Sequence, residues 1–507
     1  MASHKCLFRR TEPSDDALSF LITMGSPSLA AYSLQITHLN KYWIHRAFLG
    51  VKYPNSKLVP TALAAFHHIP IRIEQQPPFL HSLIVLPNND GFWSHLAAAN
   101  KTRRWSIPLV MSYVLVIFSV ILTTIDSIVS GPGVTGYGIA AVWTFLLPLV
   151  IGWLHVGCEP EPSHLRRSLT AANQNSWVAT GCRDHPETTN ITAVEFAEAG
   201  TVDLARKDEL KPVPVFNYSR AFVTPMTAEV VLRLMKTAAA NAKHKIPVSG
   251  SVGGGVSVWV DGEDGEILPE NRVGTTAEVT EYCTRVLQQP ERNRDSIAPL
   301  DIQPPEMTDT AYPPLENGLI TPSRWAPGIW RRVVIASILA LMLQWGTAGA
   351  AVFIHYKSPP VGLGCRSLSF LLYAAMGTLS FFLFLASSIL AHMSWPLPGR
   401  VPTRSRSHTR CTAGAIICRW LGKFVAIISA IEILSICFLN VTGAFDSCFC
   451  NSTTFDRGRQ LVFINEMHTV PGPGIIGFWV CGLVMAFFTA ILFGLSMYMG
   501  LPPRRYE

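Results

Sequence analysis

A single carboxylate in the middle of an apolar stretch is the feature of this sequence that most clearly could do chemistry. Glu432 lies near the centre of the stretch from Trp420 to Leu439, and a charge at such depth in a bilayer is costly and usually marks function. By depth, Gln344 is its first candidate partner and Asp126 a more distant one. Two interpretations stay open: a protonatable group in an ion or proton pathway, or a protonated glutamate that hydrogen-bonds between helices. We favour the second.

The sequence contains no motif typical of a catalytic nucleophile or a metal site. Neither G-x-S-x-G nor H-E-x-x-H occurs, and the eleven cysteines form no C-x-x-C pair. The glycines between Gly250 and Gly255 lack the lysine and the Ser/Thr of a P-loop, so they indicate a flexible loop rather than a nucleotide site. We therefore expect no metal and no cofactor, and we predict that the chain is not an enzyme.

Three cysteines fall in loops expected to face an oxidising compartment, namely Cys365, Cys448 and Cys450. Pairing within the C-x-C unit is geometrically awkward, so the sequence predicts a disulfide from Cys365 to either of the other two. Asn451 heads an N-glycosylation triplet on the same side, and Asn440 heads another that lies close to the bilayer.

Six apolar stretches must position these residues, and each is long enough to cross a bilayer, which takes about 20 residues. They are 107–129, 138–156, 333–354, 368–391, 420–439 and 475–499. Only 15% of the residues are charged, whereas about 25% is usual for soluble domains. The predicted fold class is an all-α membrane bundle of six transmembrane helices, with a bend in the second stretch at Pro148.

Lysines and arginines gather at one set of connections, which predicts the orientation. They precede the first and third stretches, follow the second and the sixth, and fill the loop 393–419, while the opposite loops hold only Lys357, Arg366, Arg457 and Arg459. By the positive-inside rule both termini, including the tail 501–507, and the region 158–330 are cytoplasmic. The stretch lengths favour the plasma membrane. The net charge of +7 follows this topology and forms no stripe, so we expect no nucleic-acid partner.

The N-terminal region 1–104 contains a weaker apolar stretch, from Ala17 to Ile36, that makes a seventh span possible. It is interrupted by Gly25, Ser26 and Pro27. We favour a segment that rests on the inner leaflet as an interfacial anchor.

The region 158–289 is predicted to form a small α+β cytoplasmic domain. A helix is expected over 228–243 with Thr224 or Thr227 as N-cap, and a second helix follows the capping box Thr275–Glu278. A strand is expected over 256–260, where valines alternate with other residues. Prolines dominate 290–330, which predicts a disordered linker.

Small residues recur at four-residue spacing in the last apolar stretch, at Gly482, Ala486, Ala490 and Gly494. Such a stripe lets a second helix approach closely. We expect packing within the bundle, with a homo-oligomer contact as the alternative. Membrane lipid is the other expected partner.

Two runs carry a resemblance: Thr23-Met24-Gly25-Ser26-Pro27, and Gly136-Tyr137-Gly138-Ile139-Ala140-Ala141-Val142-Trp143 continuing through Leu147-Pro148-Leu149 and Gly152-Trp153-Leu154. In them the chain resembles a group of uncharacterised polytopic membrane proteins of filamentous fungi. The resemblance implies a multi-pass membrane protein and no particular activity. Such proteins are sometimes associated with biosynthetic gene clusters.

Two functions remain as hypotheses. The first is a non-enzymatic sensor, scaffold or accessory factor whose cytoplasmic region recruits a protein partner. The second is a small-solute or ion transporter or channel that uses Glu432 and Gln344. A water-accessible cavity around Glu432 would favour the second, and a solid apolar interior would favour the first.

Overall fold

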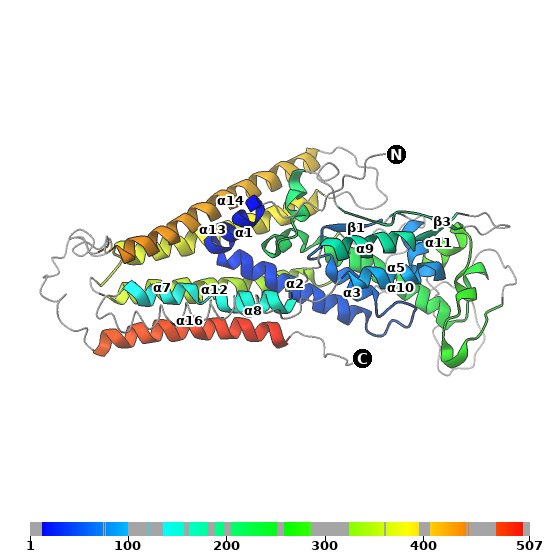
Figure 1. Cartoon of the computed structure of the whole chain (residues 1–507), viewed down its shortest axis with the longest axis horizontal. Helices are drawn as coiled ribbons and strands as arrows, with labels where there is room; N and C mark the ends of the chain where they lie inside the picture. The colour runs from blue at the N-terminus through cyan, green and yellow to red at the C-terminus, as the bar shows by residue number, and fades with distance from the viewer. Residues whose placement is uncertain are drawn as a thin grey trace, which may run out of the picture.

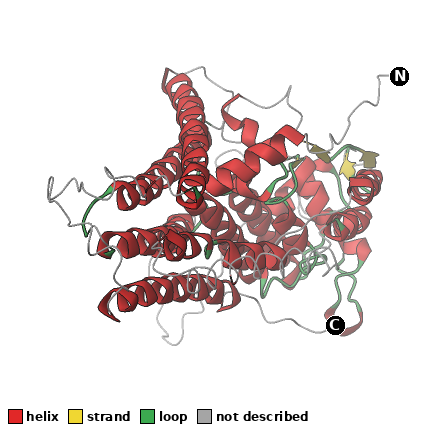
Figure 2. Ribbon diagram, turned by 60° about the vertical axis from the view of Figure 1, so that its left-hand side comes forward, coloured by secondary structure: helices red, strands yellow, loops and turns green. Residues whose placement is uncertain are grey.

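The computed structural model of this chain describes residues 13–74, 76, 78–99, 121, 135–156, 162–180, 188–196, 204–250, 258–284, 324–358, 361–394, 406–442, 445 and 473–499. The described chain is elongated, with a bundle of long helices at one end and a domain of shorter elements, the globular domain, at the other (Figure 1). The few short strands lie in the globular domain, away from the long helices (Figure 2).

Four helices are long and apolar enough to cross a membrane: α12 (Ile329–Lys357), α13 (Cys365–Met393), α14 (Arg406–Val441) and α16 (Pro473–Met499). At 1.5 Å per residue, the 29 residues of α12 extend roughly 43 Å. Four of the six predicted spans are confirmed as helices of suitable length and composition. The first predicted span, 107–129, lies outside the described residues except for Ile121.

The basic loop expected over 393–419 is in part helical, because α14 already begins at Arg406. Packing on the preceding helix explains this early start: the Ser387 hydroxyl of α13 donates a hydrogen bond to the carbonyl of Ala415, at 2.7 Å. Arginine is also a good helix former, so the basic residues do not stop the helix.

The second predicted span is two short helices, α7 (Thr135–Trp143) and α8 (Leu146–Val156). Pro148 explains the break, because its missing N–H leaves the carbonyl of Thr144 without the usual helical donor. Leu147 donates to that carbonyl instead, at 3.3 Å, in a tighter turn. The chain therefore breaks at 144–145, just before the proline, and six unbroken spans are not confirmed.

The N-terminal stretch is also broken, into α1 (Pro13–Gly25) and α2 (Pro27–Phe48), which meet at Ser26 with a bend of 103°. Pro27 disfavours a helical conformation at the residue before it, and Ser26 has a φ of −142°. Every residue from Pro27 to His38 is buried. The interpretation as an interfacial anchor is therefore wrong, since a helix resting on a leaflet keeps a polar face in water.

The break, which we call the tip (residues 24–28), lies against the middle of the long helices. The Ser26 hydroxyl donates to the carbonyl of Gly377 in α13, at 2.8 Å, and the Ser28 N–H donates to the Gln344 side chain of α12, at 3.1 Å. These contacts satisfy polar groups that a helix break would otherwise expose inside the bundle.

Both arms of this hairpin lead from the tip toward the globular domain. Asp15 of α1 forms an ion pair with Lys211, at 2.6 Å, and Ile44 and Phe48 of α2 belong to the core of the globular domain. The pair α1–α2 meets the length and composition of a span only when its two arms are taken together, and we call it the re-entrant hairpin.

One hydrophobic core holds the globular domain together, and it is built from two distant parts of the chain. The first part supplies α3 (Val59–Ala65), α4 (Phe79–Val85), η1 (Pro87–Asn89) and α5 (Asp90–Ala98). The second supplies α9 (Pro162–Gln174), α10 (Val223–Lys243), η4 (Val248–Gly250) and α11 (Thr276–Thr284), while η5 (Glu263–Gly265) and η6 (Pro269–Arg272) lie outside the core itself. Trp93, 1% exposed, donates to the carbonyl of Leu83 at the centre of this core, at 2.8 Å. The domain therefore extends beyond the predicted range 158–289.

Four short strands form two antiparallel pairs. β1 (Ile71–Ile73) pairs with β4 (Val194–Phe196), with Arg72 opposite Glu195, and β2 (Trp177–Ala179) pairs with β3 (Thr188–Asn190). The strand expected over 256–260 is not formed in its described part, Val258–Val260. The side-chain amide of Asn271 there bonds both the N–H and the C=O of Val260, at 2.9 and 2.7 Å. An amide side chain thus takes the place of a partner strand.

The helix expected over 228–243 is confirmed, but its predicted caps are wrong. α10 begins at Val223, so Thr224 and Thr227 lie inside its first turns. The capping box before α11 is confirmed: the Thr275 N–H donates to the Glu278 carboxylate at 2.8 Å, and the Glu278 N–H donates to the Thr275 hydroxyl at 3.5 Å.

The described end of the predicted disordered linker is folded, because Trp325 packs against His392 of α13 with ring centroids 4.8 Å apart.

Candidate functional site

Glu432 and Gln344 have different surroundings in the folded chain, and no hydrogen bond joins them. The Gln344 side chain accepts from the tip and donates to the carbonyl of Ala374, at 2.7 Å. One carboxylate oxygen of Glu432 is buried and has no hydrogen-bond partner among the described residues. The predicted pairing of Glu432 with Gln344 is therefore wrong, because the tip occupies the amide oxygen of Gln344 and α13 occupies its amide nitrogen. Asp126 lies outside the described residues.

Cys365, the first residue of α13, is disulfide-bonded. Its partner is not among the cysteines that the structure describes, which are free. Cys448, Cys450 and Asn451 lie outside the described residues, so the choice of partner stays a prediction. Asn440 lies in the last turn of α14.

The stripe of small residues on α16 packs inside the bundle. A side chain at Gly482 would collide with Ile354 of α12, and Ala486 and Ala490 are buried. Gly494 faces Pro148 of α8. The close helix approach that the spacing predicts is thus used within the chain.

Charged side chains gather where the bundle meets the globular domain. Two 3-10 helices, η2 (Leu204–Leu210) and η3 (Pro214–Arg220), lie at this place, which we call the junction. The Ser388 hydroxyl of α13 donates to the carbonyl of Tyr218, at 2.9 Å, and the Ser33 hydroxyl of α2 donates to the carbonyl of Val215, at 2.7 Å. Both bonds fix η3 between α2 and α13.

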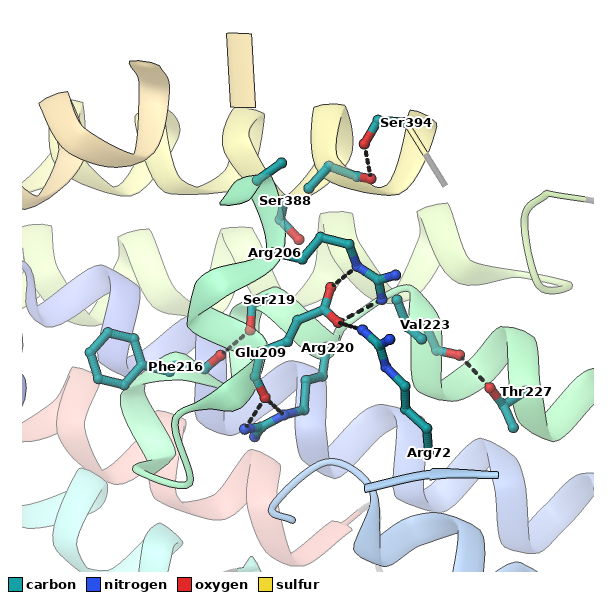
Figure 3. Close-up of polar contacts among 12 residues, drawn as sticks. Arg72, Arg206, Glu209, Phe216, Ser219, Arg220, Val223, Thr227, Ser388 and Ser394 are labelled. Carbon is teal, nitrogen blue, oxygen red and sulfur yellow. Dashed lines mark hydrogen bonds and ion pairs between the residues drawn. The ribbon is translucent and has the colours of Figure 1, made fainter. Parts of the chain in front are cut away.

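Glu209 is the central carboxylate of the junction. Arg206 donates to it through Nε and Nη2, at 2.6 and 2.5 Å, in a bidentate pair. Arg72 of β1 lies 3.9 Å away from the same carboxylate. Figure 3 shows both guanidinium groups turned toward Glu209. Glu209 therefore links η2, to which it belongs, to β1.

Asp208 connects η2 to the bundle. It is 2% exposed, accepts the hydroxyl of Tyr218 at 2.5 Å, and pairs with Lys423 of α14 at 2.6 Å. Burial and the neighbouring Asp208 raise the pKa of Tyr218 well above its usual range, so this hydroxyl stays protonated as a donor. Arg419 of α14 adds bonds to the carbonyls of Ala205 and Leu204, at 2.9 and 2.6 Å.

Arg220 closes the junction with backbone contacts rather than a carboxylate. Its Nε donates to the carbonyl of Glu209 at 3.0 Å, and Nη1 donates to the carbonyl of His67 and the side chain of Asn217 at 2.8 and 3.0 Å. Nη2 donates to the carbonyls of Glu209 and Lys211. All five N–H groups are used. Burial lowers the pKa of Arg220 to about 10, which leaves it charged at neutral pH.

A cleft of about 420 Å³ opens beside the junction. The β1–β4 pair, Glu209 and Arg220 of the junction and the start of α10 form its walls. Phe66, Ile69 and Pro70 supply apolar surface, and Arg72, Glu74 and Glu195 supply charge. Its size falls within the range of small-molecule sites, about 300–1,000 Å³.

A second, small void lies on the bundle side of the junction. It measures about 10 Å³ and is lined by Glu209, Asp208, Ser388 and Arg419, among others. That is room for about one water molecule. Glu209 lines both this void and the cleft.

The residues of the junction form no distinctive motif in the sequence. The available signal was weak: Arg220 stands alone between Tyr218 and Phe222 in an aromatic run, and Arg206 precedes two acids. Neither pattern distinguishes a buried network from a solvated surface. Among the described residues, no group of three or more His, Cys, Asp or Glu side chains could hold a metal ion.

Comparisons with known proteins found no matching family model, no matching curated protein and no matching solved structure.

Proposed function

We propose that this chain is a non-enzymatic membrane sensor. Its globular domain binds a ligand in the cleft, and the junction transmits the effect of binding to the helices of the bundle. One observation carries the proposal: Glu209 lines both the cleft and the void beside α13 and α14. A ligand that changes the surroundings of Arg72 also changes the charge next to η2, because Arg72 lies 3.9 Å from Glu209.

The packing of the tip between the long helices supports a sensor over a carrier. The tip of the re-entrant hairpin bonds α12 and α13 at the depth of Gln344, and neither the cleft nor the small void is lined by Glu432. We further propose that the globular domain and both termini are cytoplasmic, as the lysine and arginine distribution supports, and that the protein resides in the plasma membrane.

The test is to substitute a residue of the cleft and to measure hydrogen exchange in the bundle. Arg72→Gln in the full-length protein should speed hydrogen exchange in residues 408–423 of α14 by about fivefold, the effect of roughly 1 kcal/mol. Lys245→Gln is the matched control, because it removes the same charge from an exposed side chain just beyond the C-terminal end of α10. Exchange in α14 that is equal in wild type and Arg72→Gln would show that the proposal is wrong.

A second candidate function, transport of a small solute or ion, is favoured by Glu432. The oxygen without a hydrogen-bond partner among the described residues is what a proton- or cation-binding carboxylate would present. Glu432→Gln should then abolish proton or ion flux in proteoliposomes, while Glu263→Gln, an exposed acid of the globular domain, should not. Equal flux in the two variants contradicts transport through Glu432.

A further inference from the structure

The break at the tip leaves backbone oxygens without donors inside the bundle. The carbonyl of Thr23 would normally accept the N–H four residues later, but that residue is Pro27, which has none. The carbonyl of Gly25 would accept from Leu29, whose N–H donates to Ser26 instead, at 3.0 Å. Neither carbonyl has a hydrogen-bond donor among the described residues. The last turn of α1 therefore presents two oxygens with free lone pairs.

Two side chains of α14, one helical turn apart, also have buried oxygens without partners. Ser429 is 0% exposed, and its hydroxyl makes no hydrogen bond to a described residue. A serine inside a helix can bond the carbonyl four residues earlier, as Ser435 does with Ile431 at 2.8 Å. One carboxylate oxygen of Glu432 is buried and has no partner in the described part of the chain. Residues three apart on a helix lie on the same face, so the two groups are neighbours.

The two sets of oxygens lie at the same level of the bundle. α1 starts at the junction, where Asp15 pairs with Lys211, and ends where Gly25 lies against Ala430 of α14. Since α14 also leads away from the junction, the two helices run in the same direction. The carbonyls at the end of α1 therefore point toward the level of Glu432, two residues beyond Ala430.

Tyr373 of α13 connects the end of α1 with Glu432. Its hydroxyl donates to the carbonyl of Met24, at 2.7 Å, and it interacts electrostatically with Glu432. The end of α1 is the negative pole of its helix dipole, and Glu432 forms no ion pair with a described residue. A proton on Glu432 would neutralise the carboxylate but would give the two carbonyls no donor. A cation satisfies all of these oxygens at once.

We infer that one sodium ion binds between the carbonyl end of α1 and the Ser429–Glu432 face of α14. Its ligands are the carbonyls of Thr23 and Gly25, the hydroxyl of Ser429 and the carboxylate of Glu432. Carbonyls at the ends of broken helices coordinate sodium in membrane proteins, and the single carboxylate matches a single positive charge. This inference goes beyond the sensor and does not require transport, because an ion bound at one place need not cross the membrane.

Binding of radiolabelled sodium to the purified full-length protein in detergent tests the site. We expect saturable binding of one ion per chain, which an excess of choline chloride does not displace. Glu432→Gln should abolish binding, and Ser429→Ala should weaken it roughly tenfold, the effect of losing one oxygen ligand of a charge. Glu263→Gln and Ser435→Ala are the matched controls, because both side chains are exposed, and they should bind sodium as the wild type does.

Absence of saturable sodium binding to the wild type, displacement by choline, or equal binding to Glu432→Gln overturns the inference. If size-exclusion chromatography shows that Glu432→Gln is not folded, an unchanged affinity of Ser429→Ala overturns it instead. Sodium binding without sodium flux in proteoliposomes keeps the site and refutes transport. Unchanged hydrogen exchange in α14 of Arg72→Gln refutes the sensor and leaves the sodium site intact.

Discussion

At the scale of single residues, the junction shows how a buried charge is held without an ion pair. Arg220 is 4% exposed, and five oxygen contacts, four of them to backbone carbonyls, satisfy its guanidinium. Dipoles replace the carboxylate that a buried arginine usually needs. Its contacts join His67, η2 and η3, so this residue organises the junction but has no donor left for a ligand.

Arg220→Lys should therefore destabilise the protein although it keeps the charge. A lysine has three donors on a flexible chain and cannot reach the same oxygens, which costs about 2–4 kcal/mol. Chemical unfolding of the full-length protein measures this. Arg233→Lys is the control, since its pair with Glu229 is an i,i+4 contact on α10 and should change stability by about 0.5 kcal/mol or less. Equal unfolding midpoints for the two variants would refute this role of Arg220.

At the scale of elements, the re-entrant hairpin decides how the bundle packs. Gly25 allows the closest approach, because a side chain there would collide with the backbone oxygen of Ala426 in α14. The Tyr373 hydroxyl donates to the carbonyl of Met24, at 2.7 Å, beside it. Backbone against backbone cannot give way as two side chains can. The hairpin is therefore held by its tip, not only by its apolar faces.

Gly25→Ala tests this packing with a single methyl group. It should lower the free energy of unfolding by about 1–3 kcal/mol, the usual cost of overpacking, and reduce the yield of folded protein in detergent. Gly477→Ala on α16 is the matched control, because a methyl group there meets no atom within 4 Å. Thermal unfolding followed by size-exclusion chromatography gives both quantities. A Gly25→Ala protein as stable as the control would mean that the tip does not contact α14 in this way.

At the scale of the whole molecule, neutral histidines link stability to pH. His68 and His81 are buried in the globular domain, and burial lowers the pKa of His68 to about 3 and that of His81 to about 4. The unfolded chain, with histidine pKa values near 6.5, binds these protons more tightly than the folded chain does. Stability is therefore complete above about pH 6.5 and falls as the pH drops toward 4.

Each such histidine should lower the free energy of unfolding by about 1.4 kcal/mol per pH unit below pH 6. Urea unfolding of the full-length protein between pH 7 and pH 4.5 should show midpoints that fall with pH, and His81→Gln should reduce the slope. His95→Gln is the control, because His95 is not fully buried. A midpoint that stays constant over this range would contradict the buried, neutral state of these histidines.

The sequence by itself determined the features that depend only on residues close together along the chain. Apolar runs of sufficient length specify α12, α13, α14 and α16, because a helix satisfies its backbone within its own segment. Pro27 specifies a break because it disfavours a helical conformation at Ser26, and Pro148 specifies another through its missing N–H. Thr275 with Glu278 specifies a helix start. Local chemistry is enough for each of these, whatever the rest of the chain does.

Only the tertiary structure decided what those elements contact. The hydrogen bond from Ser28 to Gln344 spans 316 residues, and the ion pair of Arg272 with Asp90 spans 182. No local pattern encodes such pairs, because they depend on which apolar faces pack together. The re-entrant tip, the shared core of residues 49–99 and 162–284, the junction and the cleft all arise from contacts of this kind. A buried network and a solvated surface have the same residue types, and burial alone separates them.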